Sequence, residues 1–153
     1  MSPVLSPGEG AQRIEADRGR PDASLAEIEK LCAEAREHQL FAVCVNGSWV
    51  AAARHFLDGS DVKVASTVGF PFGAVSSDVK RYETEVAIDD GAHEIDVVLN
   101  IARLKAGEDK LVLRELVDVV EAADERTVKV ILETCLLTEL EKVRACQIVV
   151  ESG

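Results

Sequence analysis

The sequence predicts a parallel α/β fold in which helices and strands alternate along one domain. Five helical patterns and four short apolar runs follow one another, and this alternation is typical of right-handed βαβ units. Hydrophobic residues make up 47% of the 153 residues and aromatic residues only 4%, so the core must consist mainly of Val, Leu, Ile and Ala. An aliphatic core of this kind suits helices packed on a parallel sheet.

The first helix and the first strand are expected before residue 47. Residues 22–39 combine a capping box, Ser24 followed by Glu27, with one apolar stripe at helical spacing. The stripe is expected to contain Leu25, Ile28, Leu31, Cys32 and Ala35. Residues 40–46 (LFAVCVN) then predict a short buried strand, and residues 48–57 predict a second helix, which the turn DGSD ends.

The middle of the chain repeats this strand-and-helix unit. The apolar run at residues 62–70 predicts a strand, and a Gly/Pro loop separates it from a helix over residues 78–90, which Gly91 ends. Residues 91–100 (GAHEIDVVLN) predict the next strand. Asp96 is therefore a carboxylate inside a run that otherwise has the composition of a buried strand.

The last third of the chain predicts a helix over residues 108–125, a strand over residues 127–134 and a final helix over residues 137–153. Thr138 and Glu141 form a second capping box at the start of the final helix. The apolar face of the helix over residues 108–125 is expected to contain Leu113, Leu116, Val117, Val120 and Ala123.

Composition excludes several classes of function. Residues 1–12 are expected to be a flexible lead-in without the features of a secretion signal, and residues 13–153 are expected to form the single α/β domain. No apolar run approaches the roughly 18 residues of a membrane span, and a net charge of −11 disfavours nucleic acid and anionic lipid as partners. The four cysteines lack the CxxC spacing of zinc sites, so no metal is expected, and free thiols indicate the cytoplasm.

Two architectures are compatible with this alternation: an open doubly wound sheet, or part of a (β/α)8 barrel. A complete barrel typically needs about 200 residues or more. The sequence ends after a helical pattern with Gly153, where another strand is expected to follow.

Two charged residues within strands are candidate catalytic groups. Asp96 shares one strand face with Glu94 and Val98, and inward polar residues near the carboxyl ends of barrel strands are usually catalytic. Lys129 interrupts its own strand in the same way, and consecutive strands often lie side by side, so we expect the two side chains to meet. A lysine in a low-dielectric barrel is expected to have a lowered pKa and to act as a nucleophile or proton carrier. The alternative is a structural ion pair.

Three polar residues, Asn46, Asn100 and Thr134, each fall at the carboxyl end of a predicted strand. They could bind a polar substrate, or they could cap the helices that follow, which is the commoner role. The loop GFPFGA precedes a helix, where glycine-rich loops can bind phosphate, but it has neither GxGxxG nor P-loop spacing.

Four segments together resemble the bacterial type of deoxyribose-phosphate aldolase: AVCVN, VKVASTVGFPFGA, GAHEIDVVLN and VKVILETCLLTELEKVRAC. The resemblance implies a TIM (β/α)8 barrel, of which this chain holds about four to five strands. It implies a class I aldolase that cleaves 2-deoxy-D-ribose 5-phosphate to D-glyceraldehyde 3-phosphate and acetaldehyde without a cofactor. A lysine of such an enzyme forms a Schiff base with the substrate, and the imine accepts electrons when the carbon–carbon bond breaks.

The resemblance also implies roles for individual residues. Asp96 occupies the aspartate position of the family motif E-[IV]-D-[VM]-V, where it relays protons through water. Lys129 matches an accessory charge on the family's fifth strand, and Cys44 matches a cysteine beside the substrate. Asn46 and Thr134 are the further expected substrate contacts.

The sequence also departs from the family pattern. The family's Schiff-base lysine lies in a K-T-S-T-G-like segment on the sixth strand, a second lysine lies on the seventh, and phosphate-binding loops follow the seventh and eighth. Nothing in this sequence matches these segments. Around its first strand the family has D-H-T-x-L followed by K-P-D-A-T, whereas this sequence has EADRGRPDAS. The first strand is therefore in question. Either Glu15 or Asp17 could replace the family's first-strand aspartate.

Three hypotheses follow from these matches and departures. In the first, the chain is the N-terminal two-thirds of an aldolase barrel and is inactive alone. In the second, it is a non-catalytic partial barrel that forms a homo-oligomer through its open sheet edges. In the third, Lys129 itself serves as the Schiff-base amine beside Asp96.

Overall fold

The protein is described by a computed structural model that covers residues 4–153; residues 1–3 of the expected lead-in lie outside the described residues. Five strands form one sheet in the order β1-β2-β3-β4-β5, and every neighbouring pair is parallel. The strands are β1 (Glu15–Arg18), β2 (Ala42–Val45), β3 (Lys63–Val68), β4 (Glu94–Val98) and β5 (Thr127–Ile131). The predicted parallel α/β fold is confirmed.

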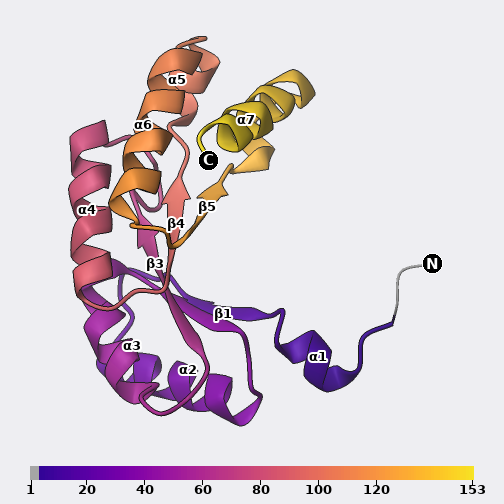
Figure 1. The fold of residues 1–153 in the computed structure, drawn as a ribbon, viewed down its shortest axis with the longest axis vertical. Helices are drawn as coiled ribbons and strands as arrows, with labels where there is room; N and C mark the ends of the chain where they lie inside the picture. Colours follow the sequence, from indigo (N-terminus) through magenta and orange to yellow (C-terminus); the bar gives the residue numbers. More distant parts are fainter. Residues whose placement is uncertain (1–3) are drawn as a thin grey trace.

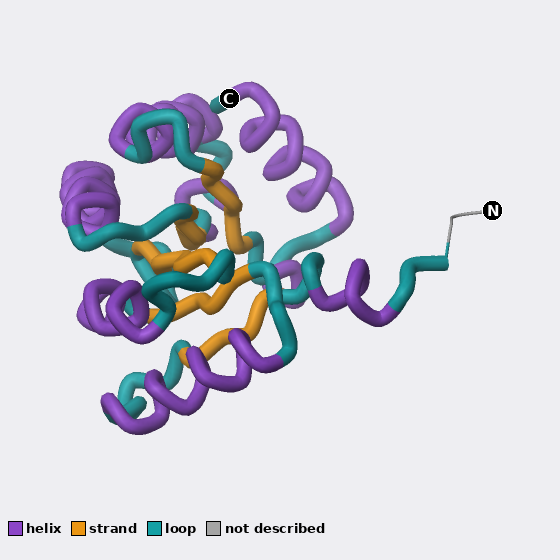
Figure 2. Tube along the Cα trace, turned by 60° about the horizontal axis from the view of Figure 1, so that its bottom comes forward, coloured by secondary structure: helices purple, strands orange, loops and turns teal. Residues whose placement is uncertain are grey.

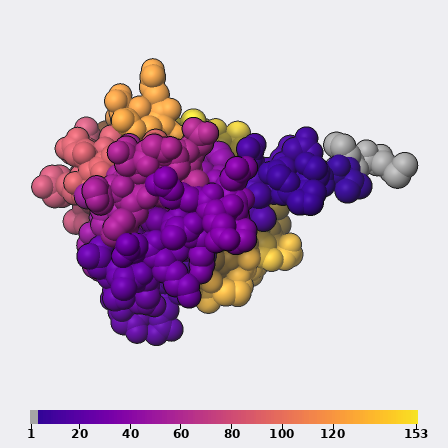
Figure 3. All heavy atoms as spheres, turned by 90° about the horizontal axis from the view of Figure 1, so that it is seen from below, coloured from indigo at the N-terminus to yellow at the C-terminus, as the bar shows by residue number. Residues whose placement is uncertain are grey.

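The helices after β1 lie around the outside of the sheet, as the ribbon and the tube both show (Figures 1 and 2). The helices are α1 (Pro7–Ala11), α2 (Leu25–Glu37), α3 (Val50–Phe56), α4 (Ser77–Asp89), α5 (Ile101–Lys105), α6 (Asp109–Ala122) and α7 (Glu139–Glu151), with the short 3-10 helices η1 (Gly47–Trp49) and η2 (Thr134–Leu136). Viewed from below, the chain around α1 projects away from the rest of the molecule (Figure 3). No helix within residues 4–153 has the length and apolar character that a membrane crossing requires.

Both predicted capping boxes are present. The Ser24 hydroxyl accepts from the backbone N–H of Glu27, whose carboxylate accepts from the Ser24 N–H, and Thr138 and Glu141 do the same for α7. The buried residues of α2 are Ile28, Leu31, Cys32 and Ala35. Leu25, which was expected among them, is 50% exposed.

Three elements and one helix face differ from the sequence prediction. The helices α1 and α5 lie where no helix was assigned, and β1 forms in the stretch EADR, where the resemblance left the first strand in question. In α6 the buried face is rotated by about one residue from the expected one and contains Val112, Glu115, Leu116 and Val119. Leu116 and Ala123 are buried as expected, whereas Leu113, Val117 and Val120 are only partly buried. The rotation has a physical cause: burying Glu115 lets its carboxylate pair with Lys80 of α4, at 2.5 Å from Oε1 to Nζ.

The core lies between the sheet and the helices. Alternate strand residues face the helices and are fully buried, including Val43, Val45, Val64, Ile95 and Val97. Residues at the intervening positions lie on the other face of the sheet, and several of them are charged. The charged set contains Glu15, Asp17, Lys63, Glu94, Asp96 and Lys129.

The sheet is strongly curved, so that the charged face is concave. β1 and β5 are the two edges of the sheet, and four strand spacings separate them, roughly 19 Å in a flat sheet. Yet Lys129 Nζ on β5 lies 2.6 Å from Glu15 Oε2 on β1. Two side chains can bridge the edges at this distance only if the sheet bends toward itself. This curvature decides between the two predicted architectures in favour of a partial (β/α)8 barrel.

Candidate active site

The candidate site is a charged cluster on the concave face of the sheet. Lys129 Nζ lies 2.6 Å from Glu15 Oε2, 3.0 Å from Asp96 Oδ1 and 3.2 Å from Glu94 Oε2. The strands fix this arrangement, because Asp96 and Lys129 are register partners in β4 and β5, and Glu94 precedes Asp96 by two residues on the same face. The predicted Asp96–Lys129 contact is therefore confirmed, and a single ammonium group faces three carboxylates.

Cys44 completes the cluster from β2. Its thiol donates a hydrogen bond to Asp96 Oδ2 at 3.3 Å. Burial, together with the nearby Asp96 carboxylate, raises the pKa of Cys44 well above its ordinary value. Cys44 therefore acts here as a neutral thiol that donates to Asp96, while Lys129 contacts the other oxygen of the same carboxylate.

The expected lowering of the Lys129 pKa is wrong. Partial burial does act to lower it, but hydrogen bonds to Glu15 and Asp96 and the attraction of both carboxylates outweigh burial. The net result is a pKa above the ordinary value for lysine. Lys129 therefore carries a positive charge at neutral pH and stabilises the surrounding carboxylates, whereas a Schiff-base nucleophile needs an unprotonated amine.

The structure shows which acidic residue of the first strand enters the site. Glu15 points into the cluster, and burial raises its pKa, with Lys129 opposing this shift and Asp96 adding to it. Asp17 lies two residues further along β1, where its side chain is exposed, and within residues 4–153 it makes no ion pair. Glu15 is thus the acid that the fold brings to Asp96 and Lys129.

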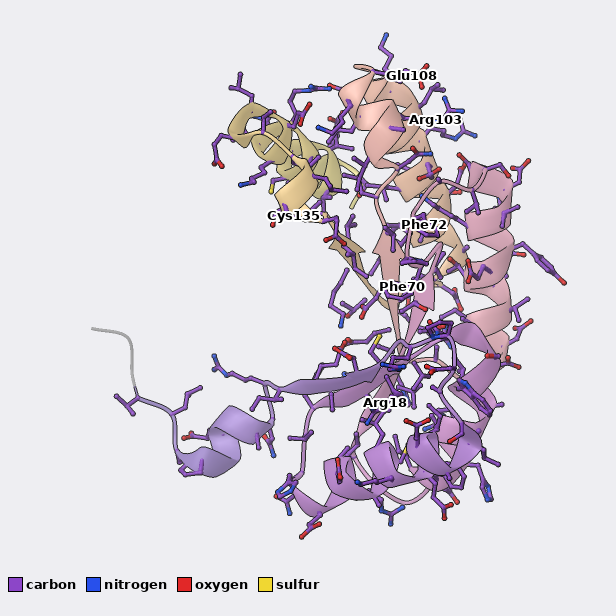
Figure 4. All side chains as sticks on the ribbon, turned by 180° about the vertical axis from the view of Figure 1, so that it is seen from behind. Arg18, Phe70, Phe72, Arg103, Glu108 and Cys135 are labelled. Atoms are coloured by element: carbon purple, nitrogen blue, oxygen red, sulfur yellow. The ribbon has the colours of Figure 1, made fainter. Side chains whose placement is uncertain are left out.

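A polar wall lies next to the cluster, at the carboxyl ends of β1, β2 and β3. Asn46 donates a hydrogen bond to the Gly19 carbonyl at 3.3 Å and accepts one from the Thr67 hydroxyl at 3.0 Å. These residues border a cavity of about 340 Å³ that Phe70 also lines. Phe70, which follows β3, is labelled in Figure 4. Asn46 therefore holds the mouth of the cavity together and does not cap the following helix.

Two of the predicted strand-end residues lie elsewhere. Asn100 accepts a hydrogen bond from the Arg103 N–H and caps α5, which is the alternative considered for it. Thr134 is exposed in η2, the turn between β5 and α7 that also carries Cys135 (Figure 4). The structure does not bring Thr134 to the charged cluster.

The cluster could in principle hold a cation other than Lys129. One ligand atom each from Glu15, Cys44 and Asp96 lies within 4.8 Å of the others, a donor set that divalent metals accept. Lys129 already contacts two of these three side chains, however, and supplies one positive charge to them. The residues present therefore form an ion-pair network in which the lysine is the cation.

Sequence reasoning missed a second buried ion pair behind the site. Lys80 of α4 and Glu115 of α6 are 0% and 2% exposed, and Lys80 Nζ also donates to the Val98 carbonyl at 2.8 Å. Val98 lies two residues after Asp96, at the carboxyl end of β4. Both residues occur in ordinary amphipathic helical segments, so the sequence carries no signal that this pair is buried.

The fold and the cluster can now be compared with known proteins. The DeoC/LacD family aldolase model matches residues 9–148, which include every strand and all four residues of the cluster core, Glu15, Cys44, Asp96 and Lys129. The chain belongs to the DeoC/LacD family of aldolases.

Individual members of this aldolase family support the assignment. The chain is 51% identical over 134 residues to the deoxyribose-phosphate aldolase of Streptococcus gordonii. The matched region covers 88% of this chain and 61% of that enzyme. A solved structure from Coccidioides immitis, described as a candidate deoxyribose-phosphate aldolase, superposes with a TM-score of 0.95 at 34% identity, over 99% of this chain and 60% of the other. The deoxyribose phosphate aldolase of Aeropyrum pernix gives a TM-score of 0.88 at 26% identity, over 97% of this chain and 62% of the other.

The chain spans 61–65% of the length of three curated relatives that it matches. This fits the five strands of the structure, since a complete (β/α)8 barrel has eight.

Proposed function

We propose that this chain contributes the proton-relay part of a class I aldolase that acts on 2-deoxy-D-ribose 5-phosphate. The observation that carries the proposal is the buried Asp96 carboxylate, held between the Lys129 ammonium and the Cys44 thiol on the concave face of an aldolase-family barrel. The curated relative from Streptococcus gordonii is named for this reaction.

The geometry gives Asp96 the means to move a proton. One carboxylate oxygen faces Lys129 and the other faces Cys44, so the anion is held in one orientation beside the interior of the barrel. When an imine forms between an enzyme lysine and the substrate aldehyde, cleavage requires that the C3 hydroxyl lose its proton as the C2–C3 bond breaks. We assign this proton transfer to Asp96 acting through water, and the later return of a proton to C2 to the same group.

Lys129 is assigned a supporting role and not the role of nucleophile. Its raised pKa keeps it charged, and a charged amine cannot attack a carbonyl. The family resemblance places the Schiff-base lysine in a sixth-strand segment, which this sequence does not match. The chain alone is therefore proposed to be inactive, and Lys129 is proposed to hold the Asp96 carboxylate in place.

Substrate contacts are proposed for Cys44 and Asn46, which border the cluster and the adjoining cavity. Thr134 remains a predicted contact that would require the turn carrying it to face the substrate. The reaction itself is proposed to belong to deoxyribonucleotide catabolism in the cytoplasm, and the four free cysteines are compatible with a reducing compartment.

A homo-oligomer is a further proposal. The Aeropyrum pernix relative is described as a tetramer. In this chain Val79, Tyr82 and Val86 leave an exposed apolar stripe along α4 at helical spacing. Light scattering coupled to size-exclusion chromatography measures the number of copies directly.

Trapping of the imine tests the proposed function. The chain is incubated with acetaldehyde or 2-deoxy-D-ribose 5-phosphate, reduced with borohydride and analysed by mass spectrometry of its peptides. We expect no adduct on Lys129 in the wild-type chain, and the same result in Lys129→Arg. A reduced adduct on Lys129 that Lys129→Arg abolishes would overturn the assignment and make Lys129 the Schiff-base amine.

A further inference from the structure

A second cavity lies where β2 and β3 begin, at the other end of these strands from the polar wall around Asn46. Its volume is about 680 Å³, against about 340 Å³ for the cavity beside Asn46. The turn between α2 and β2 and the turn between α3 and β3 form most of its wall. We call it the amino-end cavity, and its wall includes Arg36, Gln39, Leu40, Phe41, Val62 and Lys63.

One side of the amino-end cavity is apolar. Val62 is buried there, and Leu40 and Phe41 are partly buried. Lys63 Nζ lies 5.0 Å from the centroid of the Phe41 ring, a cation–π distance that keeps the ammonium group beside this apolar surface. Pockets for small molecules typically have about 300–1,000 Å³ and combine an apolar surface with a few polar groups, which is the composition found here.

Two positive side chains in the wall lack a carboxylate partner. Within residues 4–153, neither Arg36 nor Lys63 forms an ion pair. Arg36 Nη1 donates to the carbonyl oxygens of Phe56 and Asp58, both at 3.0 Å, and these bonds hold the guanidinium in place. Its Nε and Nη2 donate to no acceptor in this part of the chain, so the fixed guanidinium keeps three N–H donors for a ligand.

Positive charge gathers at this end of the sheet although the whole chain carries a net charge of −11. His93 directly precedes β4, and burial lowers its pKa. Three positive side chains lower this pKa further, and they are Arg54, Lys63 and Arg126. The opposing effect of Glu94 is smaller. An anion is therefore attracted to this end of the sheet, where it can meet Lys63.

We propose that the amino-end cavity binds a small organic phosphate with an apolar body. The phosphoryl group contacts Arg36 and Lys63, and the body lies on the apolar side of the cavity. A phosphate monoester carries roughly −1.5 to −2 charges at pH 7, which matches two unpaired cations better than the single charge of a carboxylate does. The planar guanidinium also suits phosphate oxygens, because its N–H donors can bind two of them at once.

This site is additional to the proposed function and does not depend on it. The wall of the amino-end cavity contains no residue of the charged cluster around Asp96. Arg36 belongs to α2 and Lys63 begins β3, so a bound phosphate bridges two elements of the fold. A ligand that binds only the folded chain also stabilises it by mass action.

An NMR titration of the intact 16.5 kDa chain tests the proposal. Phenyl phosphate is the probe, and inorganic phosphate and phenol represent its two halves. We expect phenyl phosphate to shift the amide signals of residues 39–41 and 60–63. It should bind at least about tenfold more tightly than either half, because only the whole probe uses both sides of the cavity. Absence of binding, equally tight binding of inorganic phosphate, or shifts centred on another region such as Asn46 would overturn the proposal.

A matched pair of variants locates the phosphoryl group. Lys63 and Lys110 are both exposed, and neither forms an ion pair within residues 4–153, so glutamine at either position leaves the fold intact. Lys63→Gln should weaken the binding of phenyl phosphate at least about fivefold, because it removes a charged hydrogen-bond donor. Lys110→Gln on α6 should leave the affinity unchanged. Equal affinities of the two variants would contradict the site.

A third variant should act in the opposite direction. Asp61 is the one carboxylate among the described residues of the wall, and it is exposed. Asp61→Asn should tighten the binding of phenyl phosphate about twofold or more, because it removes a charge that repels the anion. A general loss of stability cannot produce a gain in affinity, so failure of Asp61→Asn to tighten binding would count against the proposal.

These measurements use no aldolase substrate. Their failure therefore leaves the assignment of Asp96 unaffected, and imine trapping tests that assignment separately.

Discussion

At the scale of single residues, the cluster depends on how one lysine is shared among three carboxylates. Lys129 contacts Glu15, Glu94 and Asp96. Burial raises the pKa of Glu15, and the hydrogen bond from Lys129 opposes this shift without cancelling it. The Glu15 carboxylate is therefore stabilised less by the folded protein than by water. Its ionisation opposes folding, which gives a distinctive pH dependence.

Replacement of Glu15 by Gln should remove this pH dependence. A carboxyl whose pKa is raised on folding contributes stability that is fully present below its unfolded value of 4.5 and is lost as pH rises through the folded pKa. The free energy of unfolding of the wild type, minus that of Glu15→Gln, should therefore increase as pH falls through that window. Urea unfolding at a series of pH values measures this difference; a difference that shrinks toward acid pH would contradict the role given to Glu15.

At the scale of elements, the loop between β3 and α4 packs closely on the carboxyl end of β4. Gly73 has a positive φ of 62°, and a Cβ built on it would lie 2.2 Å from the Leu99 carbonyl oxygen. Only glycine allows both the left-handed backbone and this approach. The loop that lines the cavity beside Asn46 is thus fixed to the strand that carries Asp96.

Gly73→Ala should be strongly destabilising, and Gly107→Ala provides its matched control. Gly107 has a similar φ of 74°, but a Cβ added to it would have no atom within 4 Å. Alanine there should lower the free energy of unfolding only by the strain of the left-handed backbone, about 1 kcal/mol. Gly73→Ala adds a backbone clash and should cost at least about twice as much. Thermal and urea unfolding of the two variants give the comparison, and equal losses of stability would show that the loop does not pack on Leu99.

The Lys80–Glu115 pair joins α4 and α6 behind the same strand end. Lys80→Met alone should lower the free energy of unfolding by about 3–5 kcal/mol, because it leaves the buried Glu115 carboxyl with the Ser77 hydroxyl but without its positive partner. The double variant Lys80→Met with Glu115→Leu should recover most of this loss.

An exposed pair on α2 is the control for this prediction. Lys30 and Glu34 lie 3.8 Å apart with both side chains largely in solvent, so Lys30→Met should change stability by less than about 0.5 kcal/mol. If the double variant at Lys80 and Glu115 were no more stable than Lys80→Met, a buried charge would not be the cause of the loss.

At the scale of the whole molecule, the curvature of the sheet brings residues 114 positions apart into contact. Glu15 and Lys129 lie on opposite edges, and their contact is the most direct measure of how far the sheet bends. The same bend makes the concave face a site, because it gathers side chains from four strands around one carboxylate.

A zero-length carbodiimide cross-link measures this bend in solution. Lys129 and Glu15 are 41% and 25% exposed at 2.6 Å. Activation by carbodiimide neutralises Glu15 and so removes one of the anions that raise the pKa of Lys129; an amide should then form between them and be found in a peptide pair by mass spectrometry. Lys105 and Glu141, at 2.8 Å and with comparable exposure, serve as the positive control. A sheet that is flatter in solution would give the control cross-link without the Lys129–Glu15 product.

The sequence alone determined the alternation of elements, the two helix caps, the parallel sheet and the meeting of Asp96 with Lys129. These features depend on residues close together in the chain or on neighbouring strands, where spacing and register fix the geometry. Only the tertiary structure decided that Glu15 and not Asp17 joins the site, that Lys129 remains charged, and that Glu115 is buried against Lys80. Each of these depends on side chains from distant segments that the curvature of the sheet and the packing of the helices bring together, and no local pattern records that curvature.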